Sequence, residues 1–166
     1  MDPLAPSVAA TTLQSIPLGV LVVDDQAVVR EGVARLIACA PIAVRWISTA
    51  ATGAEAIRAA VQLRPDVVVL DADLAGEDGL ALIPQLAQRA AVLVLTSHGD
   101  SATRARARRL GACAFVEKHR PAAELLASLV DVGGIRTRGE KTPGPQGASS
   151  SIEVTATSAA PSSRAP

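Results

Sequence analysis

The stretch Pro-Asp-Val-Val-Val-Leu-Asp, residues 65–71, is an apolar run that ends abruptly in a carboxylate. Its four consecutive aliphatic residues, three of them β-branched, predict a strand buried on both faces of a parallel sheet. Asp71 stands at the carboxyl end of this strand, which is the end where open α/β sheets bind their ligands. Asp71 is therefore a candidate functional group, and the rest of the chain can be interpreted around it.

Further strands are predicted on both sides of this one, and each strand is followed by a segment with helical spacing. The additional strands are expected at 18–23, 44–48, 91–95 and 114–117. The helices are expected before Pro41, after the capping-box sequence 52–55, and at 80–88, 101–110 and 121–130, with Ser101 as a cap. This alternation predicts successive right-handed βα units, and thus an α/β fold with a doubly wound, five-stranded parallel sheet and five helices.

The two ends of the chain lack this alternation. Residues 1–17 are small and interrupted by proline, so we expect a flexible leader. From Gly133 to the last residue, 166, the chain is rich in Gly, Pro, Ser and Ala, so we expect a disordered tail. Such a segment buries too little apolar surface to offset the entropy lost on ordering. One folded domain is therefore predicted over residues 18–132.

Composition argues against several classes of protein. The formal net charge of the 166 residues is zero, which gives no bulk argument for binding nucleic acid. No apolar run approaches the roughly 18 residues that cross a bilayer, and the first residues do not form a signal peptide. Cys39 and Cys113 are too few for a disulfide framework, and we expect both to be small buried core residues. We therefore expect a cytoplasmic protein without membrane insertion.

Polar groups follow four of the predicted strands at their carboxyl ends, namely Asp24, Asp25, Asp71, Thr96 and Lys118. Three carboxylates at one sheet edge repel one another unless a cation joins them, and oxygen ligands suit Mg²⁺. Lys118 adds a positive charge and Thr96 a hydroxyl donor, a set that suits a phosphoryl group in transfer. No Gly-rich loop with a phosphate-binding lysine is present, which favours a carboxylate nucleophile that becomes an aspartyl-phosphate over direct use of ATP.

At these residues the sequence resembles the receiver domains of two-component response regulators, over about residues 18–131. The resemblance depends on four motifs in order: Val-Val-Asp-Asp at 22–25, Asp71 with Gly79, Leu-Thr-Ser at 95–97, and Phe-Val-Glu-Lys at 115–118. Residues 21–32 look most like the receivers that precede LuxR-type DNA-binding domains. No helix-turn-helix pattern follows residue 132, so we expect a stand-alone receiver without that DNA-binding output domain.

The resemblance implies a flavodoxin-like sheet with the strand order 2-1-3-4-5. It also implies that Asp71 accepts a phosphoryl group from a sensor histidine kinase or a phosphotransfer protein in a phosphorelay. Mg²⁺ would be bound directly by Asp25 and Asp71, by Asp24 through water, and by the backbone carbonyl of Asp73. Lys118 would pair with the phosphoryl oxygens.

The resemblance further implies a switch. Thr96 would move toward the phosphoryl group and Phe115 would change rotamer, which biases a two-state equilibrium at a face that binds a downstream protein. Direct DNA binding is not expected. The helix at 101–110 carries arginines at 104, 106, 108 and 109, for which a solvated face is the default interpretation, although this helix is also the first candidate for partner contact.

Two departures from the family pattern fall in the segment after Asp71. Ala72 and Ala75 stand where the family usually has an aliphatic residue and a proline, so we expect a looser loop there. Two alternative functions stay open. A pseudo-receiver would use the same fold as an interaction domain in a single state. A Mg²⁺-dependent phosphatase would need a second acid two residues after the nucleophile, and Asp73 supplies one.

Overall fold

The computed structural model describes residues 16–139, so nearly all of the expected leader and most of the expected tail lie outside the described residues. The main sheet consists of β1 (Leu18–Val23), β2 (Val44–Ala50), β3 (Val67–Asp71), β6 (Ala91–Thr96) and β7 (Ala114–Glu117). These strands are all parallel and lie in the order β2-β1-β3-β6-β7. This is the predicted flavodoxin-like order, because the intervening β4 (Asp73–Leu74) and β5 (Glu77–Asp78) form a separate small hairpin.

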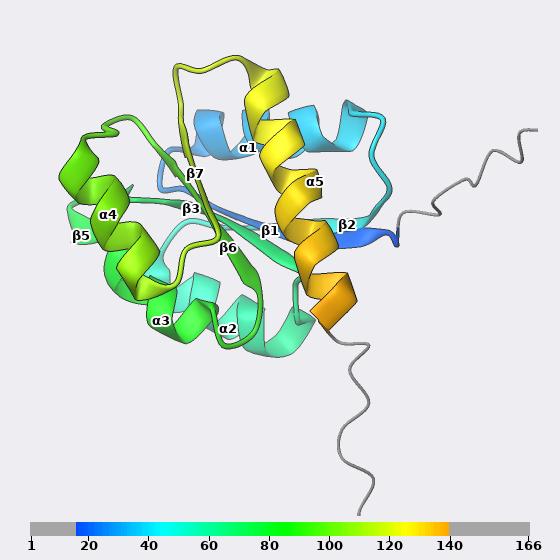
Figure 1. Cartoon of the computed structure of the whole chain (residues 1–166), viewed down its shortest axis with the longest axis horizontal. Helices are drawn as coiled ribbons and strands as arrows, with labels where there is room; N and C mark the ends of the chain where they lie inside the picture. The colour runs from blue at the N-terminus through cyan, green and yellow to red at the C-terminus, as the bar shows by residue number, and fades with distance from the viewer. Residues whose placement is uncertain (1–15, 140–166) are drawn as a thin grey trace, which may run out of the picture.

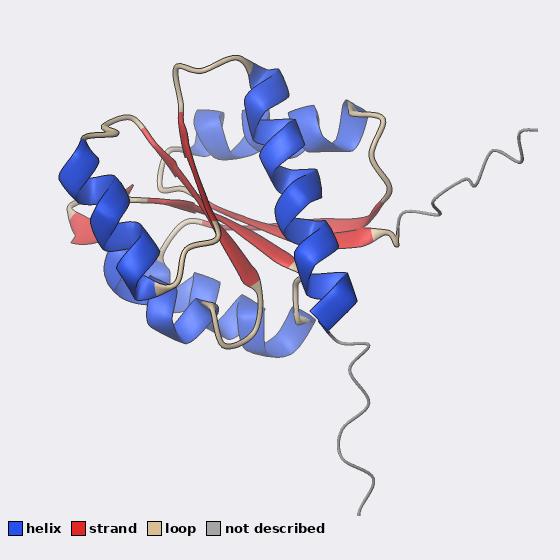
Figure 2. Ribbon diagram, viewed as in Figure 1, coloured by secondary structure: helices blue, strands red, loops and turns tan. Residues whose placement is uncertain are grey.

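Helices cover both faces of the sheet, whose strands run through the centre of the molecule (Figure 1, Figure 2). The helices are α1 (Ala27–Cys39), α2 (Gly53–Leu63), α3 (Ile83–Leu86), α4 (Ser101–Leu110) and α5 (Ala122–Gly139). One face is covered by α1 and α5, and the other by α2, α3 and α4. Alternate residues of β3 enter opposite apolar clusters: Val68 faces the α2 side and Val69 faces the α5 side. This two-sided burial explains why the central strands are continuous apolar runs.

Helix starts agree with the sequence in one case and differ in another. At α2 the predicted Thr52 cap is confirmed, because the Thr52 hydroxyl accepts a hydrogen bond from the Glu55 amide. The Glu55 carboxylate accepts a hydrogen bond from the amide of Ala51, one residue before the cap, rather than from Thr52 as in the standard capping box. At α4 the prediction of Ser101 as the cap is wrong. Asp100 is the capping residue, and its carboxylate accepts a hydrogen bond from the amide of Thr103.

The segment after Asp71 is more regular than expected. It forms a hairpin of β4 (Asp73–Leu74) and β5 (Glu77–Asp78), followed by a 3-10 turn, η1 (Gly79–Leu82). The two turn residues have positive φ, 53° at Ala75 and 85° at Gly76, as a two-residue type I′ turn requires. A proline, whose φ is fixed near −65°, cannot occupy position 75 of this turn.

The third helix is much shorter than the predicted 80–88. Pro84 lies in the first turn of α3 and has no amide hydrogen to donate to the carbonyl of Leu80. The chain therefore passes through η1 before α3 begins at Ile83.

The last helix is longer than predicted, because α5 continues through residues 133–139, beyond the expected end of the helix at 130. Val132 is buried, and a Cβ at Gly133 would collide with the side chain of Leu18. Gly133 therefore permits a close approach of α5 to β1, where the composition had suggested a break. No helix among residues 16–139 is long and apolar enough to span a membrane.

The expectation that both cysteines belong to the core is also wrong. Cys39 and Cys113 are exposed and are not joined to each other. Cys39 is the last residue of α1, and Cys113 directly precedes β7. Both lie at the ends of elements, where a residue can leave the packed face.

Candidate functional site

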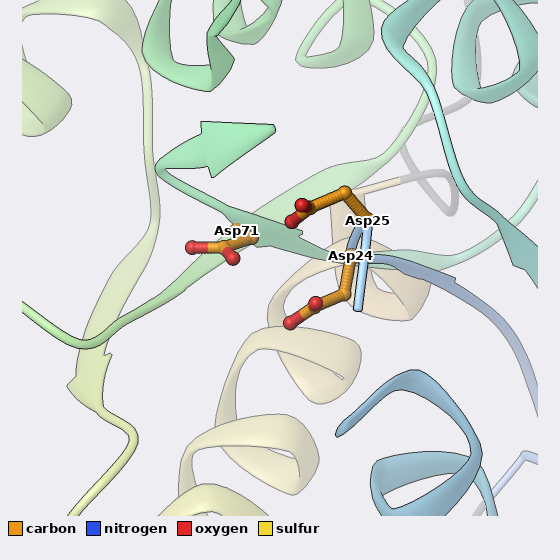
Figure 3. A group of neighbouring side chains, drawn as sticks. All are labelled: Asp24, Asp25 and Asp71. Carbon is orange, nitrogen blue, oxygen red and sulfur yellow. The ribbon is translucent and has the colours of Figure 1, made fainter. Parts of the chain in front are cut away.

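The acidic residues predicted to meet at the sheet edge do meet there. Asp24 and Asp25 directly follow β1, and Asp71 is the last residue of the adjacent strand β3. Val23 is paired with Leu70 in this register, which places Asp24 beside Asp71. One carboxylate oxygen from each of the three acids lies within 4.8 Å of the others (Figure 3).

Lys118 bridges the two most buried of these carboxylates. Its Nζ atom lies 2.6 Å from Oδ2 of Asp71 and 2.7 Å from Oδ2 of Asp24. Only 4% of Asp71 and 3% of Asp24 is exposed. The remaining oxygens accept hydrogen bonds from backbone amides, Asp71 Oδ1 from Asp73 and Asp24 Oδ1 from Gln26. Asp24, Asp71 and Lys118 thus form a buried, hydrogen-bonded ion triad at the carboxyl edge of the sheet.

Burial and charge act in opposite directions on these groups. Burial raises the pKa of the Asp71 carboxyl above its ordinary value, and the hydrogen bond from Lys118 only partly counters this effect. Burial by itself would lower the pKa of Lys118, but its hydrogen bonds to Asp24 and Asp71 prevail, so the pKa is raised. Lys118 therefore remains an ammonium, while Asp71 is more easily protonated than an exposed aspartate.

The donor set fits a hard divalent cation. Three carboxylates face one ammonium group, which leaves two negative charges uncompensated when all the acids are ionised. Carboxylate oxygens are the ligands that Mg²⁺ prefers. Among the described residues, the Asp73 side chain is not part of this acidic group, because its Oδ1 atom accepts a hydrogen bond from Gly76 in the hairpin turn. The predicted role of the Asp73 carbonyl as a ligand stays a prediction.

Thr96 and Phe115 lie on the neighbouring strands. Thr96 ends β6 and is buried, and its hydroxyl is bonded within its own loop, accepting from the His98 amide and donating to the His98 carbonyl. Phe115 lies on β7, packs partly buried against the α4 side of the sheet, and has the Arg104 guanidinium 4.6 Å from its ring centroid. Both predicted switch residues are therefore near the site, each with a local partner.

Comparison with known proteins decides the family. The response regulator receiver domain family matches residues 20–130, about two thirds of the chain. The protein belongs to this family. Receivers of response regulators accept phosphoryl groups, and the order of strands and the acidic edge agree with that membership.

Relatives of this receiver are found among proteins of several kinds. A protein-glutamate methylesterase/protein-glutamine glutaminase of Koribacter versatilis is 32% identical over 81% of this chain and 39% of its own length. A LuxR-family response regulator from Aurantimonas is 31% identical, with a TM-score of 0.66 over 73% of this chain and 88% of that one. A Burkholderia pseudomallei response regulator, solved with a phosphorylated aspartic acid, calcium ion and citrate, is 26% identical, with a TM-score of 0.62 over 74% and 72% of the two chains.

The receiver spans only part of its curated relatives, between 34% and 53% of the length of the first three that it matches. The predicted similarity to receivers of LuxR-type regulators is confirmed. The relative named as a methylesterase is a longer protein, and this chain is similar to 39% of its length.

One contributor to the receiver site was missed by sequence reasoning. Arg30 lies on α1, and its Nη1 atom donates to the backbone carbonyls of Asp24, at 2.7 Å, and Asp25, at 3.3 Å. It thereby fixes the turn that carries both acids. The only signal in the sequence was the spacing of an arginine between one and two helical turns after an acidic pair, which by itself does not distinguish this role from solvation.

Proposed function

We propose that Asp71 of this receiver accepts a phosphoryl group from a sensor histidine kinase or phosphotransfer protein. The observation that carries the proposal is the contact of Lys118 with both buried carboxylates, Asp24 and Asp71, at the carboxyl edge of the sheet. Such a lysine is positioned to transfer its contact from the carboxylate to a phosphoryl oxygen. The phosphorylated aspartic acid in the Burkholderia pseudomallei relative supports the same chemistry.

In the proposed step, a carboxylate oxygen of Asp71 attacks phosphorus and forms a new P–O bond. The P–N bond of the donor phosphohistidine breaks, and the imidazole nitrogen keeps the electron pair. Mg²⁺, bound by Asp25 and Asp71, by Asp24 through water and by the Asp73 carbonyl, would neutralise the phosphoryl oxygens. The Asp73 amide and Lys118 orient the attacking carboxylate from opposite oxygens. Attack of water on the same phosphorus would return free Asp71 and inorganic phosphate.

The proposed output is a change in the surface formed by α4, β7 and α5. Thr96 would leave its His98 contacts to reach the phosphoryl group, and Phe115 would move behind it. The altered surface would bind a downstream protein, and we propose neither direct DNA binding nor catalysis beyond the receiver's own phosphorylation and dephosphorylation. We place this relay in the cytoplasm, where reduced cysteines such as the unpaired Cys39 and Cys113 are usual.

The two alternatives have less support. A phosphatase would need Asp73 as a second acid beside Asp71, but the Asp73 carboxylate is exposed and bonded to the hairpin turn. A pseudo-receiver would have no need of Asp24, Asp71 and Lys118 in a hydrogen-bonded triad.

The decisive experiment is intact mass after incubation with acetyl phosphate, with and without Mg²⁺. The wild-type protein should gain one phosphoryl group only when Mg²⁺ is present, and Asp71→Asn should gain none. Asp73→Asn is the matched control, because it retains the backbone amide and carbonyl and changes only an exposed carboxylate. This control should still be phosphorylated.

If the folded wild-type protein shows no adduct, either Asp71 is never phosphorylated or the aspartyl-phosphate is hydrolysed rapidly, and the two cases have to be distinguished. Beryllofluoride, a stable phosphoryl mimic, serves for this purpose. If neither acetyl phosphate nor beryllofluoride modifies the Asp71 site while Mg²⁺ binds, the pseudo-receiver is the correct account.

A further inference from the structure

Arg104 on α4 makes two contacts with β7 at once. Its guanidinium lies over the Phe115 ring, at 4.6 Å from the centroid, and its Nη2 atom is 3.3 Å from Oε1 of Glu117. The Arg104 side chain is 40% exposed and that of Glu117 21% exposed, so neither contact is fully open to solvent. Arg104 was expected to lie on a solvated face, but it packs against the strand that carries the aromatic switch residue.

Glu117 extends this contact to the loop that follows Thr96. A Cβ atom at Gly99 would collide with the Glu117 carboxylate, so the side chain lies directly on the backbone of that loop. Residue 117 is also paired with Thr96 in the register of β6 and β7. The Oε2 atom of Glu117 is 3.0 Å from His119 Nε2, which lies in the connection to α5. Glu117 is therefore in contact with three segments that border the switch.

We infer that Arg104 is a positioning residue that stabilises the unphosphorylated arrangement of this receiver, by covering the Phe115 ring and by pairing with Glu117 against the Thr96 loop. This inference rests on the proposed function and deepens it, because it names what phosphorylation has to release. When Phe115 moves, the ring leaves the guanidinium, and the cation–π contact is lost only in the switched state. Arg104 therefore increases the free-energy difference between the unswitched and the switched state, which the contacts of the phosphoryl group have to overcome.

Phe115 is the only phenylalanine in the sequence, so with isotope-labelled phenylalanine every ring signal in the NMR spectrum comes from this residue. The test compares wild type with Arg104→Met, which retains an unbranched apolar side chain and removes the charge. Arg108→Met is the matched control, since Arg108 is an exposed arginine one turn further along the same helix. Each protein is titrated with beryllofluoride in excess Mg²⁺.

In Arg104→Met, the free-state ring signal should move toward its beryllofluoride-bound position, and half-saturation should need about fivefold less beryllofluoride, equivalent to about 1 kcal/mol. Arg108→Met should match wild type in both readouts. Glu117→Gln retains Arg104 above the ring but removes the ion pair, so it should show a smaller shift in the same direction. This second variant also keeps the inference testable if Arg104→Met does not fold.

The inference is overturned if Arg104→Met and Glu117→Gln, both folded, match wild type in ring signal and midpoint while wild type responds to beryllofluoride. In that case the proposed function still stands. If the wild-type ring does not respond and Asp71 forms no adduct, both the proposed function and this inference fail.

Discussion

Two sets of ion pairs in this receiver differ in burial and therefore in what they contribute. We call Asp24, Asp71 and Lys118 the inner triad. Its side chains are 4%, 5% and 15% exposed. We call the pairs made by Arg104 with Glu117 and by Arg106 with Asp78 the outer pairs. The side chains of Arg106 and Asp78 are 45% and 46% exposed.

The comparison shows why the same chemical contact serves two purposes. A buried ion pair cannot lose one partner without stranding a charge away from water, whereas water replaces the partner of an exposed one. The inner triad is therefore fixed and suited to chemistry. The outer pairs connect α4 to β7 and to the hairpin after Asp71, and they can break at small cost when the surface changes.

The largest expected effect follows from removing the inner cation. Lys118→Met should lower the free energy of unfolding at neutral pH by about 2–3 kcal/mol, because two buried carboxylates lose their counter-charge while some water still reaches the site. Arg106→Met in an outer pair should cause no measurable loss. Urea denaturation of wild type, Lys118→Met and Arg106→Met without Mg²⁺ measures both effects. Equal losses of unfolding free energy in the two variants would contradict the distinction between the inner triad and the outer pairs.

A second prediction concerns pH. Burial raises the pKa of Asp71, and Mg²⁺ binding needs its ionised form, so Mg²⁺ affinity should begin to fall on acidification at a higher pH than for an ordinary aspartate. Without Mg²⁺ the raised pKa means that stability decreases as pH rises from the unfolded-state pKa to the folded-state pKa, since the native state binds the proton more tightly.

Calorimetric titration with Mg²⁺ at a series of pH values measures this dependence. Asp71→Asn should bind Mg²⁺ more weakly and lose the pH-dependent component assigned to Asp71. The same pH midpoint in wild type and variant would assign the titration to another group.

The smallest expected effect lies in the hairpin next to the outer pairs. Ala75 has a φ of 53°, a left-handed conformation that favours glycine. Ala75→Gly should relieve this strain but also increase the entropy of the unfolded chain, for a net gain of about 0.5 kcal/mol. Thermal unfolding should show a small rise in Tm. Ala75→Pro, which cannot adopt a positive φ, should instead destabilise the protein.

Local sequence predicted the structure well where apolar residues mark buried strands and polar residues mark the ends of those strands. The aliphatic runs predicted the central strands, and the polar residues at their ends predicted the edge where Asp24, Asp71 and Lys118 meet. Local sequence was misleading at residue 133, where the Gly-rich composition suggested the end of the last helix but α5 continues. Gly133 continues α5 because its missing side chain leaves room for Leu18.

The sequence by itself determined the βα alternation, the position of the acidic edge and the family motifs, because each depends on residues close together in the chain. Only the tertiary structure decided that Arg30 binds the carbonyls of the acidic turn and that Arg104 covers Phe115. Arginine has a long, flexible side chain that is equally suited to solvent or to a distant acceptor. Whether an arginine points into solvent or binds an acceptor depends on which groups the fold places near it, and the neighbouring sequence does not specify those groups.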